Sequence, residues 1–150
     1  MTNFIFRVMG GVALVWCATA AFAQDEPLKP ARLTPDEFKW TTSASGNQQA
    51  PFAGDPQKPG IYAYRTKFPA NFRNQPHFHP DARIVTIISG TLYVGYGEQF
   101  DESKMKALPA GSIFTEPPRQ AHYVWAKDGE VTIQVVGHGP SASTPVQAKP

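Results

Sequence analysis

The stretch that decides the fold is PHFHPDARIVTIISG, residues 76–90, which joins two closely spaced histidines to a β-branched run. Side chains alternate between the two faces of a strand, so His77 and His79 are expected to point the same way. Two neutral imidazoles that converge on one point suit a divalent metal, which needs at least a third protein ligand. His122 is the natural third ligand, because it opens another apolar strand after a proline-rich turn. The stretch therefore predicts a three-histidine metal site on a β framework.

The segments on either side of this stretch are typical of an all-β protein. Short apolar runs alternate or are rich in β-branched residues, and turn-forming residues separate them. Ser89-Gly90 predicts a hairpin, Asp128-Gly129 predicts a type I′ turn between the last two strands, and Gly95 indicates a bulge or a close backbone approach. The expected strands span residues 61–68, 83–89, 91–97, 112–116, 122–126 and 130–136. Short strands in this number, without a long helix, predict an all-β barrel or sandwich.

Residues 1–23 have the pattern of a cleavable signal peptide. Arg7 supplies a positive charge, residues 8–21 form a mostly apolar stretch shorter than a membrane span, and Ala21-Phe22-Ala23 is a signal-peptidase site. The alternative, a lipoprotein signal that uses Cys17, requires a small residue where Trp16 stands. We therefore expect a periplasmic or secreted protein that keeps no membrane segment after cleavage. The mature chain then has no cysteine, hence no disulfide and no thiolate ligand.

Three further segments are expected after the signal peptide: an N-terminal arm over residues 24–59, a barrel over residues 60–140 and a flexible tail over residues 141–150. Within the arm, TPDE at residues 34–37 is a capping box that predicts a short helical turn through about Trp40, and an edge strand is expected near residues 50–53. A chain of 150 residues with a net charge of +2 suits one domain and no nucleic-acid partner. It also lacks the serine-nucleophile elbow, the phosphate-binding loop and the dinucleotide fingerprint.

Two motifs resemble those of the cupin superfamily. The first cupin motif runs from H-x-H, through a glutamate, to a glycine at a hairpin, and this chain has His77-Phe78-His79 and then Gly90. The second motif is a glycine, a proline, another glycine and a histidine, and this chain has Gly111, Pro117 and His122 in PAGSIFTEPPRQAH. The resemblance covers about residues 60–140 and is closest to small exported single-domain cupins with an RmlC-like fold. It implies an all-β, double-stranded β-helix (jelly-roll) barrel after the short helical turn, a central metal on His77, His79 and His122, and a homodimer.

Two residues depart from the family pattern. Arg83 stands at the position of the usual glutamate ligand, and Arg119 stands at the late glycine of the second motif. A guanidinium has only donors and cannot bind a metal, so a buried Arg83 needs an acidic partner, for which Glu116 and Asp81 are available. Three arrangements are open. Glu116 supplies the missing ligand, Arg83 pairs with Glu116 and leaves the metal three histidines, or Arg83 binds the carboxylate of a substrate.

A three-histidine site with open positions suits a metal-dependent enzyme that acts on a small organic substrate, as an oxygenase or as an isomerase or lyase. Iron, manganese or zinc is the expected divalent transition metal, and nickel and copper also suit these ligands. Arg83 would orient an anionic substrate, and Glu116 or Tyr93 would transfer protons. The alternative is a non-catalytic protein that binds or senses a metal or ligand, since one fold hosts both classes. The aromatic residues Tyr93, Phe114 and Trp125 are candidates to line the pocket, whereas His138, between two glycines, is expected at a turn.

Overall fold

The structure is a computed structural model that describes residues 25 and 27–147. The expected signal peptide, residues 1–23, lies outside the described residues, as do residues 148–150 of the expected tail. Across the described part of the chain, no helix is long and apolar enough to cross a membrane.

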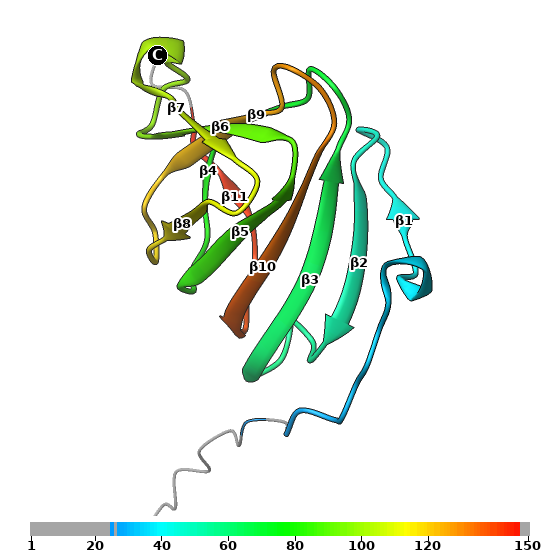
Figure 1. The fold of residues 1–150 in the computed structure, drawn as a ribbon. Coiled ribbons are helices and arrows are strands. Elements are labelled where there is room, and N and C mark those ends of the chain that lie inside the picture. Colours follow the sequence, from blue (N-terminus) through cyan, green and yellow to red (C-terminus); the bar gives the residue numbers. More distant parts are fainter. Residues whose placement is uncertain (1–24, 26, 148–150) are drawn as a thin grey trace, which may run out of the picture.

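The described chain folds into two antiparallel sheets, as expected for an all-β protein (Figure 1). One sheet has six strands in the order β1 (Thr41–Thr42), β2 (Gln48–Ala53), β3 (Gly60–Phe68), β10 (Val131–Gly139), β5 (Arg83–Ser89) and β8 (Ile113–Glu116). The other has five strands in the order β11 (Thr144–Pro145), β4 (Arg73–Phe78), β9 (His122–Trp125), β6 (Thr91–Tyr96) and β7 (Lys106–Pro109). The long strands β2, β3 and β10 lie side by side in one layer of Figure 1.

Two predicted hairpins are wrong, although the strands on either side of them are found. β5 pairs with β10 and β8, whereas β6 pairs with β7 and β9, so the turn at Gly90 carries the chain from one sheet to the other. The turn at Gly129 likewise joins β9 to β10, which lie in different sheets. A type I′ turn requires a positive φ at both central residues, but the φ of Gly129 is not positive. Gly90, by contrast, has a φ of +78°.

The N-terminal arm is part of the first sheet rather than a separate segment, because it supplies β1 and β2. The predicted helical turn is present but shorter, a 3₁₀ turn η1 (Pro35–Glu37), in which the Glu37 carboxylate accepts a 2.6 Å hydrogen bond from the Thr34 backbone N–H. A second 3₁₀ turn, η2 (Glu102–Lys104), follows β6. Phe38 is buried, with the guanidinium of Arg65 from β3 4.3 Å from its ring centroid. Aromatic burial and cation–π contact thus hold the arm against β3.

The expected flexible tail is ordered over its first residues. Thr144 and Pro145 form β11 and pair with Phe78 and His77 of β4, and the Val146 N–H donates a 2.9 Å hydrogen bond to the Pro76 carbonyl. Composition alone suggested fraying here, but these backbone bonds to β4 are independent of side-chain type.

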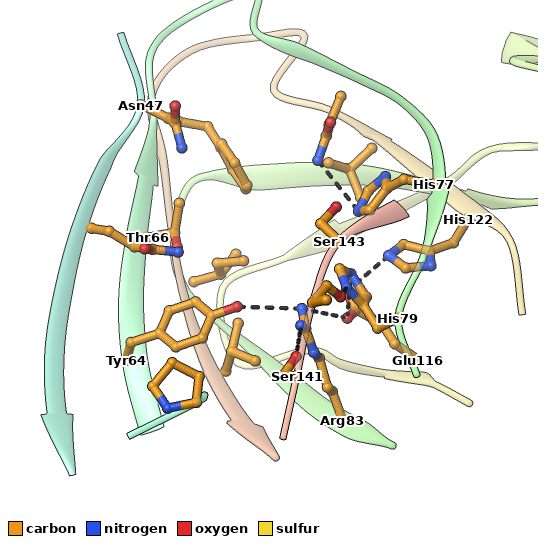
Figure 2. A pocket seen from close by; sticks show the side chains of 18 of the residues that line it. Asn47, Tyr64, Thr66, His77, His79, Arg83, Glu116, His122, Ser141 and Ser143 are labelled. Carbon is orange, nitrogen blue, oxygen red and sulfur yellow. Dashed lines mark hydrogen bonds and ion pairs between the residues drawn. The ribbon is translucent and has the colours of Figure 1, made fainter. Parts of the chain in front are cut away.

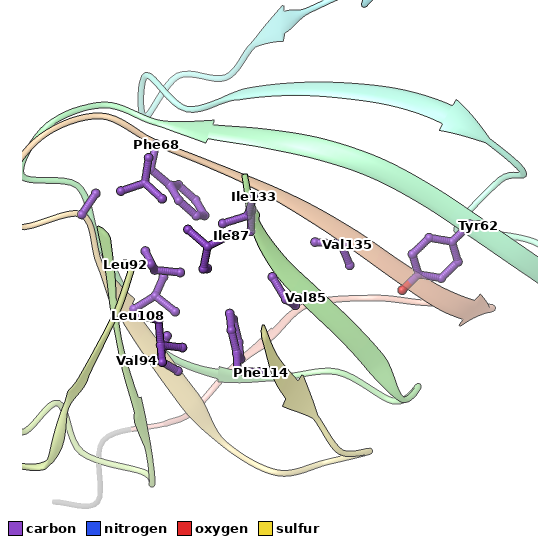
Figure 3. Close-up of a cluster of buried hydrophobic side chains, with 13 residues drawn as sticks. Tyr62, Phe68, Val85, Ile87, Leu92, Val94, Leu108, Phe114, Ile133 and Val135 are labelled. Atoms are coloured by element: carbon purple, nitrogen blue, oxygen red, sulfur yellow. The ribbon is translucent and has the colours of Figure 1, made fainter. Parts of the chain in front are cut away.

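The core lies between the sheets and is built from the inward-facing residues of alternating strands (Figure 3). Val85 and Ile87 of β5 meet Ile133 and Val135 of β10, while Leu92 and Val94 of β6 cover them from the other sheet. Gly95 allows the close approach that its position indicated, because a Cβ there would overlap the ring of Tyr123, which is fully buried. The apolar core fills one part of the barrel interior and leaves a polar site in another.

Candidate metal centre

The three histidines predicted as ligands meet at one buried point. His77 in β4 and His122 in β9 are direct cross-strand partners, and His79 follows one residue beyond the end of β4. Each of the three offers a ligand atom, and these atoms lie within 4.8 Å of one another. His122 is 1% exposed and His79 is 4% exposed, so the cluster is shielded from bulk water. The alternation of side chains along the strand, which motivated the prediction, therefore holds through His79.

Backbone carbonyls fix the orientation of all three imidazole rings. Nδ1 of His77 lies 2.8 Å from the Gln75 carbonyl oxygen, Nδ1 of His79 lies 2.7 Å from that of Ala142, and Nδ1 of His122 lies 3.2 Å from that of Gln120. A carbonyl oxygen can only accept, so each Nδ1 carries a proton and donates. The Nε2 atoms are then the available ligand atoms, and that of His77 lies 3.4 Å from the side-chain amide nitrogen of Asn74. An outer carbonyl of this kind is the usual partner of a metal-binding histidine.

Burial keeps two of the rings neutral. Desolvation lowers the pKa of His79 to about 4, and the neighbouring Arg83 charge acts in the same direction. Desolvation also lowers the pKa of His77, with the Gln75 hydrogen bond opposing it. Both side chains therefore present an Nε2 lone pair at neutral pH, which is the form that binds a metal.

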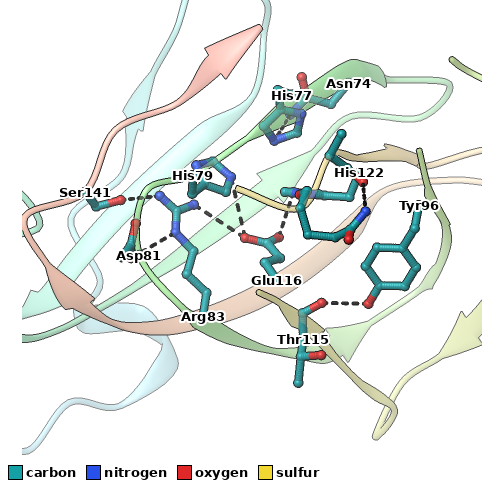
Figure 4. Close-up of polar contacts among 12 residues, drawn as sticks. Asn74, His77, His79, Asp81, Arg83, Tyr96, Thr115, Glu116, His122 and Ser141 are labelled. Carbon is teal, nitrogen blue, oxygen red and sulfur yellow. Dashed lines mark hydrogen bonds and ion pairs between the residues drawn. The ribbon is translucent and has the colours of Figure 1, made fainter. Parts of the chain in front are cut away.

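Glu116 of β8 adds a carboxylate to the same point (Figure 4). Its Oε1 lies 3.2 Å from Nε2 of His122, and its Oε2 lies 3.5 Å from Nε2 of His79. Burial acts to raise the pKa of Glu116, but the contacts with His122, His79 and Arg83 outweigh it, and the pKa is lowered overall. The carboxylate is thus ionised at neutral pH.

With Nδ1 protonated, the Nε2 atoms of His122 and His79 are hydrogen-bond acceptors that face the acceptor oxygens of Glu116. Oε2 of Glu116 and Nε2 of His122 are buried without a hydrogen-bond partner. An unpartnered buried acceptor is costly, and when the rings are protonated on Nδ1 their Nε2 lone pairs repel the carboxylate unless a proton or a metal ion lies between them. The donor set of three imidazoles and one carboxylate, all buried, fits a divalent transition metal.

Arg83 contacts four groups of the protein and also lines the pocket described below. It is the cross-strand partner of Glu116, with Nη1 3.6 Å from the Glu116 carboxylate and 3.3 Å from the Tyr64 hydroxyl. Its Nε lies 3.4 Å from the Asp81 carboxylate, and its Nη2 donates to the hydroxyl of Ser141. Asp81 in turn accepts a 2.5 Å hydrogen bond from the hydroxyl of Tyr62.

A pocket of about 350 Å³ opens beside the histidines (Figure 2). Its apolar wall is shared with the core and includes Phe114, Ile133 and Val135. Its polar wall includes the side-chain amides of Asn47, Gln49, Gln57 and Asn74 together with the hydroxyl-bearing residues Tyr64, Thr66, Ser141 and Ser143. A small organic molecule with an apolar body and polar edges suits such walls.

Of the residues predicted for the site, Arg83 and Glu116 lie in it and Phe114 lines the pocket, but Tyr93 and Trp125 do not. The Tyr93 hydroxyl donates a 2.8 Å hydrogen bond to Asp128 on the outside of the second sheet. The tyrosine in the pocket is Tyr64, which the sequence reasoning missed. Strand alternation was the available signal, because Leu92 and Val94 face inward and therefore turn Tyr93 outward.

His138 lies in β10 rather than at a turn, and it is not part of the cluster. Its Nε2 is 2.9 Å from the Asp25 carboxylate on the exposed surface, and this contact raises the pKa of His138.

Comparison with solved structures supports the barrel. The chain superposes on an RmlC-like cupin from Shewanella frigidimarina with a TM-score of 0.60 and 15% identity, covering 75% of this chain and 94% of that one. It superposes on the polyketide cyclase RemF from Streptomyces resistomycificus with a TM-score of 0.66 and 13% identity, covering 81% of this chain and 88% of that one. At such identities the likeness shows the fold alone, and it confirms the predicted double-stranded β-helix.

Sequence comparison gives the family. The chain is 36% identical over 67 residues to a putative germin-like protein, subfamily 1 member 12, from Arabidopsis thaliana. The match covers 43% of this chain and 30% of that protein, so the chain spans about a third of this curated relative. The model of the AraC-like ligand-binding domain matches residues 58–145, which is more than half of the chain. The protein therefore belongs to the AraC-like ligand-binding family within the cupin superfamily.

Proposed function

We propose that this protein is an exported metal-dependent enzyme that binds a divalent transition metal through His77, His79 and His122 and converts a small organic molecule in the adjoining pocket. One observation carries the proposal. Nε2 of His122 and Oε2 of Glu116 are buried without a hydrogen-bond partner beside the other two histidines, at the wall of a pocket large enough for a small molecule. A cation at this point offsets the repulsion and leaves a face open to the pocket.

Glu116 is the fourth group at the metal point in this proposal. Its two oxygens approach the same Nε2 atoms that would bind the ion. The carboxylate missing from position 83 is thereby supplied from β8, the strand paired with β5. Arg83 then holds Glu116 in place, because its other donors are directed at Asp81, Tyr64 and Ser141.

The residues around the pocket can also handle protons. Burial raises the pKa of Tyr64 to about 12, so its hydroxyl stays protonated and can donate a hydrogen bond to a bound molecule. Glu116 is ionised and lines the pocket, so it is a candidate to accept a proton from a ligand there. When bound, iron would supply oxygenase chemistry, whereas zinc or manganese would supply Lewis-acid chemistry for an isomerase or lyase.

A non-catalytic binding protein is the second candidate, and the match to a ligand-binding family favours it. In that case the metal and the amide-rich wall would capture a molecule without changing it. Turnover separates the two: an enzyme consumes its ligand, whereas a binding protein releases it unchanged.

The first experiment is elemental analysis of the protein produced from the full chain and purified without chelator or nickel resin. We expect about one transition-metal ion per chain in the wild type and in His138→Ala, a matched control that removes an exposed histidine. We expect its loss in His122→Ala. Wild-type protein without metal, even after incubation with iron(II), manganese(II) and zinc(II), would contradict the proposal.

The same preparation tests export. Intact-mass analysis of protein from the periplasm or the culture medium should give a chain that begins at Gln24. A chain that stays in the cytoplasm with residues 1–23 attached would contradict the export part alone.

A further inference from the structure

Residues 141–147, here called the C-terminal strap, run back across the edge of the pocket after β10. The Ser141 N–H donates a 2.6 Å hydrogen bond to the Pro56 carbonyl, and the Val146 N–H donates a 2.9 Å hydrogen bond to that of Pro76. Between them, β11 pairs with the last two residues of β4. The strap is thus fastened to two separate parts of the barrel by backbone bonds.

The strap also contacts two residues of the candidate metal centre, His79 and Arg83. Its Ala142 carbonyl accepts the hydrogen bond from Nδ1 of His79. The Ser141 hydroxyl accepts a hydrogen bond from Arg83 (Figure 2, Figure 4). Ser141, Ala142 and Ser143 form one wall of the pocket.

His79 differs in this respect from the other two ligand histidines. His77 and His122 take their carbonyl partners from residues two positions earlier, Gln75 and Gln120, so their own strands set their orientation. The partner of His79 is 63 residues away in sequence. The orientation of the His79 ring therefore depends on the strap being docked.

We propose that the Ala142 carbonyl and the Ser141 hydroxyl are positioning groups of the metal centre, and that docking of the strap and metal binding are coupled. This inference rests on the proposed metal binding. The outer hydrogen bond fixes the ring of a ligand histidine and raises its basicity, and its loss typically weakens metal binding by about 10- to 100-fold. Coupling is reciprocal, so a metal on His79 holds the strap down by the same factor.

The strap is suited to such coupling because, apart from its backbone bonds, its side chains add little to its docking. Ala142 to Pro145 are exposed, so few of its side chains are buried by docking. Segments with little buried apolar surface open locally at a small free-energy cost. The bonds at His79 and Arg83 then add to the backbone bonds in holding the strap docked.

Two truncations and one exchange measurement test the inference. Cobalt(II) is titrated by its visible absorption into wild type, into a chain that ends at Pro140 and into a matched control that ends at Gln147. We expect the first truncation to weaken cobalt binding by about 10- to 100-fold and to alter the cobalt spectrum. We expect the control to bind as wild type does. Hydrogen exchange of peptides that cover residues 141–147 in the intact wild-type chain should slow when cobalt is bound.

The outcomes separate this inference from the function on which it rests. Wild type that binds no cobalt overturns both. Wild type that binds cobalt, with equal affinity in the two truncations or with exchange of the strap unchanged by metal, overturns only the role of the strap. If the chain ending at Pro140 does not fold, the exchange measurement on the intact chain decides.

Discussion

Glu116 determines the charge of the buried site. Arg83 faces two carboxylates, Asp81 and Glu116, and the pKa of each is lowered despite burial, so both are ionised at neutral pH. For Asp81, hydrogen bonds from Tyr62 and Ser141 and the Arg83 charge outweigh the effect of burial. The acids thus outnumber the cation, and a buried surplus of negative charge favours a bound metal ion.

The substitution Glu116→Gln tests this point. It removes the surplus charge while keeping the side-chain shape, so we expect the dissociation constant for zinc or manganese to rise by about 10- to 100-fold. Glu130→Gln, which changes an exposed glutamate, is the matched control. Competition with a chromogenic chelator gives the constants. Equal affinities in the two variants would show that Glu116 does not contribute to metal binding.

The buried histidines predict acid sensitivity of the metal-free protein. The pKa of His79 is about 4 in the folded chain, and the ordinary value is 6.5, so between these values the unfolded chain binds a proton that the folded chain does not. The free energy of unfolding should therefore fall as the pH is lowered from 6.5 towards 4. Denaturant unfolding at pH 7 and pH 5 with a chelator present measures it. The His79→Gln variant should show a shallower fall, and an identical pH dependence in both proteins would refute this origin.

Two turns between consecutive strands, at Gly90 and Gly129, lead the chain from one sheet to the other. Gly90 is the clearest case, because its φ of +78° lies in the region that favours glycine, and a Cβ there would overlap the Glu130 carbonyl oxygen. Glycine is thus required where the chain leaves β5 for the opposite sheet.

The Gly90→Ala substitution should destabilise the fold by about 2 kcal/mol or more, through backbone strain and the steric overlap. Gly129→Ala is the control, because no atom lies within 4 Å of the added Cβ and φ is not positive. Thermal unfolding of both variants measures the difference. A Gly90→Ala protein as stable as the control would show that this turn can relax.

Local patterns predicted the longer strands well, missed the short strands β1, β7 and β11, and predicted the strand partners poorly. The strands and the convergence of His77, His79 and His122 follow from the two-residue alternation of side chains, which is a local property. Strand pairing depends on contacts far apart in sequence, so Ser89-Gly90 indicated a turn but not that it changes sheet. The contact of Ala142 with His79 could not be predicted from the sequence, because every residue type has a backbone carbonyl.

On the whole molecule, the outer face of the first sheet carries an apolar stripe, formed by Ile84, Ile88, Ile113 and Val136. Ile113 is 63% exposed and Ile84 is 55% exposed, and Val136 is the cross-strand partner of Ile84. Exposed apolar side chains gathered on one face of a sheet commonly mark an interface, and such a face suits two-fold pairing with a second copy. We propose that this stripe forms a homodimer.

Native mass spectrometry and sedimentation test the dimer. Wild type should be dimeric at micromolar concentration, and Ile113→Lys should be monomeric, because the charge would be buried between two copies. Leu33→Lys, which alters an equally apolar residue 45% exposed in the N-terminal arm, should remain dimeric. A monomeric wild type would rule out this interface.

The pairing of Arg83 with Glu116 on one rung of the β5–β8 ladder has a consequence for how the site is recognised in a sequence. Exchanging the two residues would move the carboxylate to the other strand and leave the charge of the rung unchanged. Two substitutions, Arg83→Glu and Glu116→Arg, would restore the familiar motif without adding or removing a charge. If Glu116 holds the metal as proposed, a motif confined to one strand misses a ligand that the paired strand supplies.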